Sequence, residues 1–425
     1  MPTTLNQPKF TDRQTNLSRL TLAVMFACSL SIGILPQSML SLCIVLCCAV
    51  LLFCGKLYLG FPFVILYNSV YGLVFGVSIL RLYTLMILVQ LAMKASAKET
   101  IKAKFLLPLS VYFLFLIMVM MPLNLRMGIF LFFDIICCLS IAVDLSRNTD
   151  LLKRFFKTYV FVCLCSFITG IVIGNTMGGG EFSYLRFNGT VEDPNYMGFF
   201  FTLAVVSIIC LKLFDRKWRI VLVITLYAMM MASLSMTAIV VNLLLWLFYL
   251  VAMKKLRLSS LFIIAFVILV ILALYSYGLK NPNVPILGNL CARVAEKLQN
   301  LSAGDMDGFT TNRTVAQTKH WLYYISLPII NILFGGISVH PRYIHPDLGG
   351  VAHNEYLDLL LNVGLVGAAL MIGFFLTTYL TYIKRYRQDR QDHDLCIVML
   401  KTTWILYAFT LTLFLDYRFM LIFLI

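Results

Sequence analysis

The chain has 425 residues, of which 61% are hydrophobic and 12% are charged, and its mean hydropathy is +0.90. A soluble domain of average composition carries about 25% charged residues, so these values exclude a chain that is mainly exposed to water. The net charge of +15 does not require a nucleic-acid partner, because Lys and Arg also gather in the cytoplasmic loops of membrane proteins. We therefore expect an all-α, polytopic membrane protein that binds no nucleic acid.

Long apolar segments follow one another along the chain, and most are long enough to cross a hydrocarbon core of about 30 Å. The predicted spans lie at 19–35, 38–54, 58–75, 77–93, 105–121, 127–144, 158–174, 196–213, 218–233, 236–252, 258–277, 355–382 and 396–416. The total is about 12 or 13 transmembrane helices. It depends on how 58–93 is divided and on whether the closing DYRFMLIFLI adds a half-helix.

Basic residues are concentrated between these spans. The clusters are Lys9, Arg13 and Arg19; Lys94, Lys98, Lys102 and Lys104; Arg147, Lys153, Arg154 and Lys157; Arg216, Lys217 and Arg219; Lys254, Lys255 and Arg257; and Lys384, Arg385, Arg387 and Arg390. Every cluster falls on the same side of the membrane, which the positive-inside rule makes cytoplasmic, together with the N-terminus. Transmembrane helices then occupy 1–277, with an outer loop at about 175–195, and 354–425. A large extracytoplasmic loop with short helices occupies 278–353.

The first outer loop contains the stretch YLRFNGTVEDPNYMG at 184–198. Its Asp193-Pro194-Asn195 sequence predicts a turn and an N-cap for the following span, which is a structural role. Arg186 is the only basic residue of this loop and has no comparable local role. Arg186 is therefore left without a local structural explanation.

The second outer loop contains the stretch TTNRTVAQTKHW at 310–321. The two threonines and the asparagine at 310–312 favour an N-cap, after which Arg313, Gln317 and Trp321 share one helix face. An arginine in the first turn opposes the helix dipole. That cost becomes useful if an anion binds there, because the guanidinium offers phosphate a planar fork of donors. The alternative is a solvated arginine on an amphipathic surface helix.

The stretch VAHNEYLDLLLNVGLVG at 351–367 places His353 and Asn354 before a long apolar run. If a helix begins near His353, Gly364 lies within about 20° of the same face and about 16 Å deeper, with Gly367 one turn further. Small residues let another helix or a ligand tail approach the backbone. The stretch then describes an imidazole at the water boundary above a smooth groove. The alternative is a polar cap followed by packing glycines.

Arg81 and Asp134 are ionisable residues inside predicted spans and are expected to face the protein interior, because lipid exposure would be costly. Arg81 lies near the outer end of its span and could join the site, whereas Asp134 could be a structural hydrogen-bond partner. Three further residues near His353 are chemically suited to metal binding, namely His340, His345 and Asp347. Their spacing matches no metal-ligand motif and prolines interrupt it, so we expect no metal.

The sequence at 353–367 resembles a known motif. In it, His353 and Asn354 are followed after nine residues by Gly364-Leu365-Val366-Gly367. The motif is H-[N/S/Q]-x9-G-x-x-G, and it belongs to the O-antigen ligase and O-antigen polymerase superfamily.

Two other stretches resemble the same family, in the same order, so that the resemblance covers about 180–370. They are Arg186 and Gly189 followed by Pro194-Asn195, and Arg313, Gln317 and Trp321 followed by Gly335-Gly336. One departure lies at 233–237, where Met236 stands at the position at which many relatives carry arginine.

The resemblance implies a metal-independent glycosyltransferase of GT-C type that needs no cofactor. It would lie in the bacterial plasma (inner) membrane with its active site outside. Its donor would be a glycan on undecaprenyl diphosphate and its acceptor a glycan or lipid, with membrane lipid, a chain-length regulator and a flippase protein as further partners.

By the family's mechanism, His353 would be the general base that deprotonates the acceptor hydroxyl, and Arg186 and Arg313 would bind the diphosphate leaving group. The other candidates are Asn354, Gln317 and Arg81 for substrate binding, and Gly364 and Gly367 for the groove or its packing.

Three functions are compatible with the membrane topology. A polymerase would join lipid-linked repeat units into O-antigen, capsule or exopolysaccharide, and a ligase would move the finished glycan to a lipid core or a protein. A lipid-linked sugar transporter or flippase would place its binding residues near the bilayer midplane, in matched halves with broken helices. The candidate residues lie in outer loops instead and no internal repeat is visible, which argues against a transporter. The motif is shared by polymerases and ligases and does not separate them, and we favour a polymerase because polymerases are the more varied and numerous members of the family.

Overall fold

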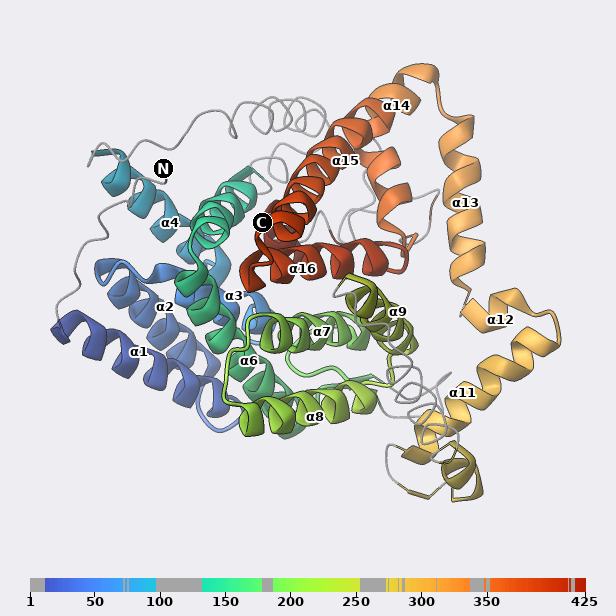
Figure 1. Ribbon diagram of the computed structural model, residues 1–425, viewed down its shortest axis with the longest axis horizontal. Coiled ribbons are helices and arrows are strands. Elements are labelled where there is room, and N and C mark those ends of the chain that lie inside the picture. The colour runs from blue at the N-terminus through green and yellow to red at the C-terminus, as the bar shows by residue number, and fades with distance from the viewer. Residues whose placement is uncertain are drawn as a thin grey trace.

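The computed structural model describes residues 12–96, 132–177, 186–252, 273–336, 348 and 352–425, except positions 72, 75, 274, 282, 285, 286, 311, 412 and 414–416. Most of these residues are helical, and the only sheet among them is the two-residue pair of β1 (Thr176–Met177) with β2 (Arg186–Phe187) (Figure 1). The prediction of an all-α fold is confirmed.

The helices before the central outer segment are α1 (Asp12–Leu30), α2 (Gln37–Phe53), the 3-10 helix η1 (Leu57–Gly60), α3 (Phe61–Tyr67), α4 (Ile79–Ser96), a helical segment at 132–147, α6 (Thr149–Val172), α7 (Pro194–Cys210), α8 (Arg216–Ala232) and α9 (Met236–Ala252). The later helices are α11 (Leu287–Ser302), α12 (Met306–Thr310), α13 (Arg313–Ser326), α14 (Ile329–Phe334), α15 (Glu355–Asp389), α16 (Asp392–Ala408) and α17 (Tyr417–Leu424).

Helix α7 forms the centre of the bundle and packs against α6, α8, α9 and α16 (Figure 1). Its sequence is apolar on every side, and nearly all of its residues are buried, as expected for a helix surrounded by others. At Gly198 the backbone approaches α9 so closely that an added Cβ would lie 2.7 Å from the Ala238 Cβ. This contact holds the N-terminal ends of α7 and α9 side by side.

Two helices of the described chain, α6 and α15, are long and apolar enough to cross a membrane, as judged by length and composition. Shorter apolar helices accompany them at Gln37–Phe53, Leu57–Tyr67, Ile79–Met93, Pro194–Cys210 and Met236–Val251. The predicted span at 105–121 and most of the one at 258–277 lie outside the described residues.

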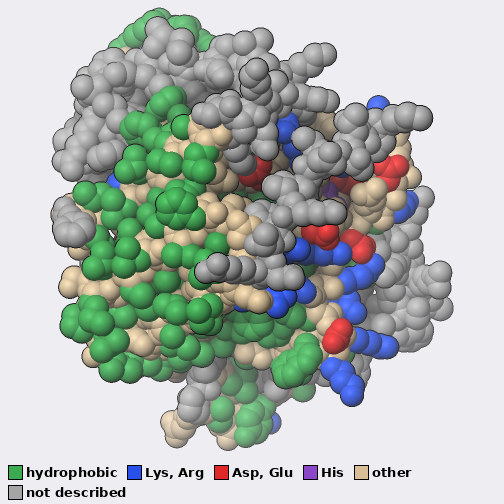
Figure 2. All heavy atoms as spheres, turned by 90° about the vertical axis from the view of Figure 1, so that its left-hand side faces the viewer, with side chains coloured by type: hydrophobic (Ala, Val, Ile, Leu, Met, Phe, Trp, Pro, Cys, Tyr) green, Lys and Arg blue, Asp and Glu red, His purple; other side chains and the backbone are tan. Residues whose placement is uncertain are grey.

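Large hydrophobic side chains are exposed along several of these helices. Leu20 of α1, Phe53 of α2, Ile224 of α8 and Leu243 of α9 are each more than half exposed. Figure 2, which views the molecule from the left-hand side of Figure 1, shows hydrophobic side chains over a broad area, with Lys and Arg gathered along one side of it. An apolar surface of this extent indicates contact with lipid or with another protein.

The segment predicted as a large outer loop contains four consecutive helices, α11 to α14, which run along the right-hand side of Figure 1. Helix α11 packs against α12 and α12 against α13, while α14 packs against α15. The segment therefore returns to the bundle at the N-terminal half of α15.

Helix α15 is interrupted at Gly364, which has φ 66° and ψ −177°. Only glycine adopts this conformation at low cost. A Cβ built at Gly364 would lie 2.4 Å from the Gly335 nitrogen and 2.4 Å from the Leu333 carbonyl carbon. The N–H of Gly336 donates a hydrogen bond of 3.0 Å to the Asn362 carbonyl oxygen. Close packing of two glycine-containing backbones thus joins α14 to α15.

This geometry corrects the helical-wheel expectation for 351–367. The helix begins at Glu355, so His353 lies outside it, and the helical path is broken at Gly364 itself. The argument that placed Gly364 beneath His353 on one continuous face is therefore wrong. The segment that approaches Gly364 is 333–335 of the same chain, and Gly367 is buried within the bundle.

Candidate functional site

The turn before α7 supplies the first part of the candidate site. Asp193 is the N-cap, and its Oδ1 accepts a hydrogen bond of 2.6 Å from the Asn195 N–H. Pro194 follows at the first helical position, where its missing N–H has no cost. The structure therefore has the turn and cap that the Asp-Pro-Asn sequence predicts.

Arg186, in β2, is buried with only 5% of its surface exposed. Its Nε donates a hydrogen bond of 3.2 Å to the Ser233 carbonyl oxygen, and its Nη2 lies 3.5 Å from Asn195 Oδ1. The Ser235 hydroxyl donates to the same Oδ1 at 2.7 Å. Leu234 has φ 51°, which turns the chain between α8 and α9 so that its neighbours reach this network. All of these partners are uncharged.

Arg313 occupies the first position of α13, as predicted, and its Nη1 lies 3.5 Å from the Thr237 hydroxyl at the start of α9. Asn312 is the N-cap but has φ 59° and makes no side-chain capping bond. The hydroxyl of Thr310 instead accepts a hydrogen bond of 3.3 Å from the Thr314 N–H. Arg186 and Arg313 therefore converge on 233–237 from different parts of the chain.

The two arginines lie in one electrostatic cluster. Burial lowers the pKa of Arg186 to about 10, with repulsion from Arg293 and Arg313 acting in the same direction and Asp193 opposing it. Burial also lowers the pKa of Arg313, and Asp193 and Tyr196 partly offset this effect. The ion pairs found among the described residues all lie elsewhere. Arg186 is thus buried and Arg313 partly buried, and among the described residues neither guanidinium is in ion-pair contact with a carboxylate, an arrangement that favours a bound anion.

His353 precedes α15 and has φ 53°. Burial lowers the pKa of its imidazole, repulsion from Arg313 and His320 lowers it further, and attraction to Asp193 opposes both. The imidazole is therefore near the same charged groups as the arginines. It is also neutral near pH 7, the form that can accept a proton.

Asn354 has a structural role that the sequence analysis did not assign to it. It is the N-cap of α15, where its Oδ1 accepts hydrogen bonds of 3.0 Å from the Tyr356 N–H and 3.3 Å from the Leu357 N–H. These bonds satisfy two of the N–H groups that every helix start leaves without partners. They also fix the direction in which the chain leaves His353.

Arg81 lies in another part of the molecule. Its Nη1 pairs with Asp134 Oδ1 at 2.5 Å, joining α4 to the segment 132–147. Helix α4 is at the left of Figure 1, whereas α13 is at the right. Both residues face the interior, as expected, but the suggestion that Arg81 joins the site is not supported by this placement. Its guanidinium has a structural partner instead.

Two other predicted residues lie on α13 beyond Arg313. Gln317 is half-buried one turn after Arg313, and the side chain of Trp321 is 46% exposed, with its ring 5.9 Å from that of Tyr324. His340, His345 and Asp347 lie outside the described residues. In the part of the chain that is described, no three His, Cys, Asp or Glu side chains are grouped as metal ligands would be.

Two residues near the cluster were missed by the sequence analysis. Arg293, on α11, is 8% exposed, and its charge acts on Arg186. His320, on α13, is 1% exposed, donates from Nδ1 to the Ala316 carbonyl oxygen at 2.7 Å, and acts on His353. His320 follows Arg313 by seven residues, a spacing that places the two residues on one helix face. This spacing could have indicated from the sequence that His320 lies near the site.

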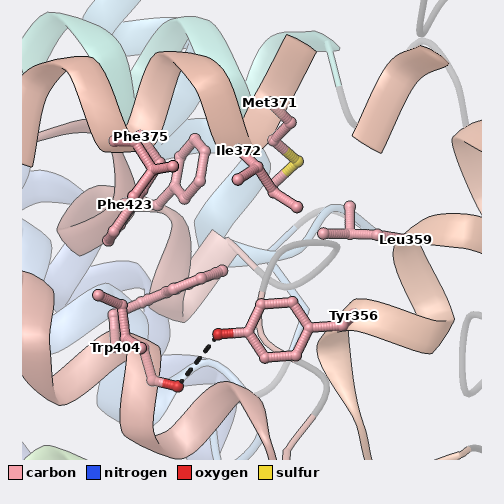
Figure 3. A pocket seen from close by; sticks show the side chains of 9 residues that line it. Tyr356, Leu359, Met371, Ile372, Phe375, Trp404 and Phe423 are labelled. Atoms are coloured by element: carbon pink, nitrogen blue, oxygen red, sulfur yellow. Dashed lines mark hydrogen bonds between the residues drawn. The ribbon is translucent and has the colours of Figure 1, made fainter. Parts of the chain in front are cut away.

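An apolar cavity of about 120 Å³ lies between α15, α16 and α17, beside the first turn of α15 (Figure 3). Tyr356, Phe375, Trp404 and Phe423 are among its lining residues, and the Tyr356 hydroxyl donates to the Ile405 carbonyl oxygen at 3.4 Å. The lining is aromatic and aliphatic. The cavity lining therefore lacks the charged and acid–base groups found around Arg186, Arg313 and His353.

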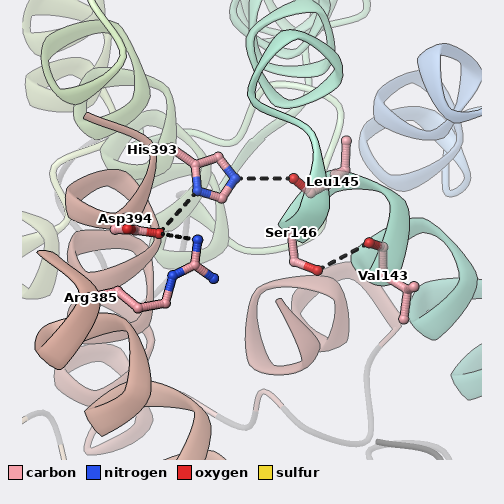
Figure 4. Close-up of polar contacts among 6 residues, drawn as sticks. All are labelled: Val143, Leu145, Ser146, Arg385, His393 and Asp394. Atoms are coloured by element: carbon pink, nitrogen blue, oxygen red, sulfur yellow. Dashed lines mark hydrogen bonds and ion pairs between the residues drawn. The ribbon is translucent and has the colours of Figure 1, made fainter. Parts of the chain in front are cut away.

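A second polar group, in which His393 and Asp394 are buried and Arg385 is exposed, lies at the opposite end of α15 (Figure 4). Asp394 Oδ1 lies 3.1 Å from Arg385 Nη2 and 3.3 Å from His393 Nδ1, and His393 Nε2 lies 3.3 Å from the Leu145 carbonyl oxygen. These contacts join α15 and α16 to the helical segment 132–147. Since every member has a partner within the bundle, we interpret this group as structural.

Neither a protein-family model nor a curated protein matches the chain.

Proposed function

We propose that the chain is a membrane glycosyltransferase of GT-C type that polymerises lipid-diphosphate-linked oligosaccharide units on the outer face of the bacterial plasma membrane. The observation that carries the proposal is the grouping of Arg186, Arg313 and His353, which come from three separate segments. Together they provide a base and an anion-binding site. Transfer of a glycan from a diphosphate donor requires both. The motif resemblance adds the substrate class.

In the proposed reaction, the acceptor hydroxyl attacks the anomeric carbon of the donor sugar and gives its proton to His353. The bond between that carbon and the diphosphate oxygen breaks, and the lipid diphosphate leaves with the electron pair. The guanidinium groups of Arg186 and Arg313 offset the charge that develops on this leaving group. Arg186 is buried and Arg313 is partly buried, and such interactions are stronger there than in water.

Helix direction and charge support the proposed membrane placement. Helices α7 and α15 both begin at the arginine cluster, and basic residues follow α7 at Arg216 and lie near the end of α15 at Arg387. If these apolar helices cross a bilayer, the positive-inside rule puts the basic ends in the cytoplasm and the cluster outside. The exposed hydrophobic side chains of α1, α2, α8 and α9 would then face lipid.

A reconstitution experiment tests the proposed function. Purified full-length protein in liposomes receives an undecaprenyl-diphosphate-linked repeat unit alone, and the products are separated by size. Chain growth supports the polymerase. A requirement for a separate lipid or protein acceptor would instead identify a ligase, and movement of the unit across the bilayer without bond formation would identify a transporter.

Two variants make this experiment specific to the site. His353→Ala should abolish chain growth, because it removes the base. Lys319→Gln alters an exposed residue of α13 and should leave growth unchanged. If His353→Ala forms chains at the wild-type rate, His353 is not the base and the proposed mechanism is wrong.

A further inference from the structure

Two cysteine side chains meet where α1 and α2 pack against each other, at the lower left of Figure 1. Cys28 lies two residues before the end of α1, Cys43 lies in the second turn of α2, and their Sγ atoms are 3.3 Å apart. Both are free thiols. The S–S distance in a disulfide is about 2.05 Å, so a shift of about 1.2 Å brings the two sulfur atoms to bonding distance.

The same two thiols are more accessible than most cysteines of the chain. Of the twelve cysteines, nine are buried and three are half-buried, and the three are Cys28, Cys43 and Cys165. Exchange between a thiol and a disulfide requires that the reagent reach the sulfur atom, so it is confined to these three positions in the folded protein. Two of the three accessible thiols are thus in contact with each other, while Cys165 lies on α6.

The last turn of α1 also supports the segment that contains Arg186. The Ser29 carbonyl oxygen accepts a hydrogen bond of 2.8 Å from the Thr169 hydroxyl of α6. The next residue of α6, Gly170, packs so closely that an added Cβ would lie 2.4 Å from the Cα of Gly189, which follows Arg186 by three residues. A covalent bond in the last turn of α1 therefore restrains the surface on which the Arg186 segment rests.

This end of α1 lies on the same side of the bundle as the candidate site, because the contacts through α6 join the two. The membrane placement proposed above, on which this inference rests, makes that side extracytoplasmic. Cys28 is then within one turn of the outer end of α1, and Cys43 is about 9 Å along α2 from its outer end. Disulfides form and persist outside the bacterial cytoplasm, where protein oxidants supply them.

We propose that Cys28 and Cys43 form a thiol–disulfide site whose oxidant is the disulfide of an oxidised protein dithiol, and that closing this site stiffens the support of the Arg186 segment. One cysteine thiolate attacks the disulfide of the oxidant, which forms a mixed disulfide and frees one oxidant thiol. The second thiolate attacks the cysteine sulfur of the mixed disulfide, closes the bond between α1 and α2, and frees the other oxidant thiol. The cysteine pair loses two electrons and two protons, and these reduce the oxidant to its dithiol.

Dithiodipyridine, a small uncharged disulfide, is the probe for this site. Full-length protein in liposomes is treated with the reagent, remaining thiols are alkylated, and the peptides are identified by mass spectrometry. The wild type should yield a peptide pair linked through Cys28 and Cys43 that retains no pyridyl group. In Cys28→Ser, Cys43 should keep a pyridyl group, because no second thiol displaces it. Cys165→Ser changes the third accessible thiol and should form the linked pair as the wild type does.

Hydrogen–deuterium exchange measures the effect of the bond on the Arg186 segment. In the oxidised wild type, the amides of 186–192 should exchange several-fold more slowly than in the reduced protein, because local opening of this segment is restrained. The amides of α13 should not change, and a reducing phosphine should restore the original rates. Cys28→Ser should show no difference between the two conditions.

Two results would overturn the proposal. One is a wild-type protein that keeps pyridyl groups on both cysteines, which would show that the two sulfur atoms do not meet. The other is a linked pair with unchanged exchange at 186–192, which would reject the effect on the Arg186 segment. Neither measurement requires a transfer reaction. A linked pair without chain growth would therefore reject the polymerase and keep the thiol–disulfide site, whereas chain growth without a linked pair would do the reverse.

Discussion

Arg313 and His353, forty residues apart in the sequence, lie close enough for the charge of the guanidinium to lower the pKa of the imidazole. The arginine begins α13 and the histidine precedes α15, so each stands at the start of a helix rather than within one. This relationship couples the anion site to the base. A bound diphosphate would neutralise Arg313 and so make His353 a stronger base when the donor is present.

The coupling predicts a shift in the pH dependence of activity. Arg313→Gln removes a positive charge that disfavours the imidazolium, so the pKa of His353 should rise toward its ordinary value. Because the neutral imidazole is the active form, the acidic limb of the profile of kcat/KM, which reports on the free enzyme, should move to higher pH. Overall activity should also fall, since an anion-binding group is lost. An unshifted acidic limb would show that the two residues are not coupled.

Substitution of Asp193 should change the pKa of His353 in the opposite direction with little change in structure. Asp193→Asn removes the charge that raises the pKa of His353 but keeps a side-chain oxygen for the N-cap of α7, where Asn serves as well as Asp. The acidic limb of kcat/KM should therefore move to lower pH. Titration of the histidine ring signals by NMR checks the assignment directly. If both variants moved the limb in the same direction, charge would not be the cause.

Much of the bundle could be predicted from hydropathy, because long apolar segments between polar residues have few alternatives to helix. The predicted spans at 38–54 and 236–252 are α2 and α9, with ends that differ by no more than one residue. The break in α15 could not be predicted in this way. It depends on the contact of Gly364 with Leu333 and Gly335, which are about thirty residues away in sequence, and hydropathy contains no information on that contact.

The candidate site was predictable only where a residue conflicted with its local surroundings. Arg313 opposes a helix dipole and so suggested an anion, whereas Arg186 only lacked a local structural role and was assigned to the diphosphate by the motif resemblance. Arg293 lies on an amphipathic helix, where an arginine normally faces solvent, and only the packing of α11 shows that it is buried. Arg81 attracted attention because a charge inside an apolar span is costly, and its ion pair with Asp134 accounts for that position.

The pair of Arg81 and Asp134 should contribute to stability and not to substrate binding. Arg81→Met leaves a mostly buried carboxylate without its partner and should lower the free energy of unfolding by about 1–3 kcal/mol, below the range for fully buried pairs because Arg81 is 26% exposed on its side chain. Replacing both residues, by Met and Leu, should cost less than the sum of the single changes. Denaturation in detergent measures these values. A raised KM for the donor in the double variant would instead indicate that Arg81 contributes to substrate binding.

Gly364 should be intolerant of any side chain, and Gly373 on the same helix provides the control. Gly364→Ala forces a Cβ into the backbone of 333–335 and imposes a conformation that costs a non-glycine residue about 1–3 kcal/mol before any clash is counted. A Cβ at Gly373 meets nothing within 4 Å, so Gly373→Ala should leave stability unchanged or raise it by up to about 1 kcal/mol through better helix propensity. The unfolding temperatures of the two variants measure this difference in stability, and equal stability would show that the break in α15 is not required.

Gly364→Ala should reduce chain growth as well, because 333–335 precedes the segment that leads to His353.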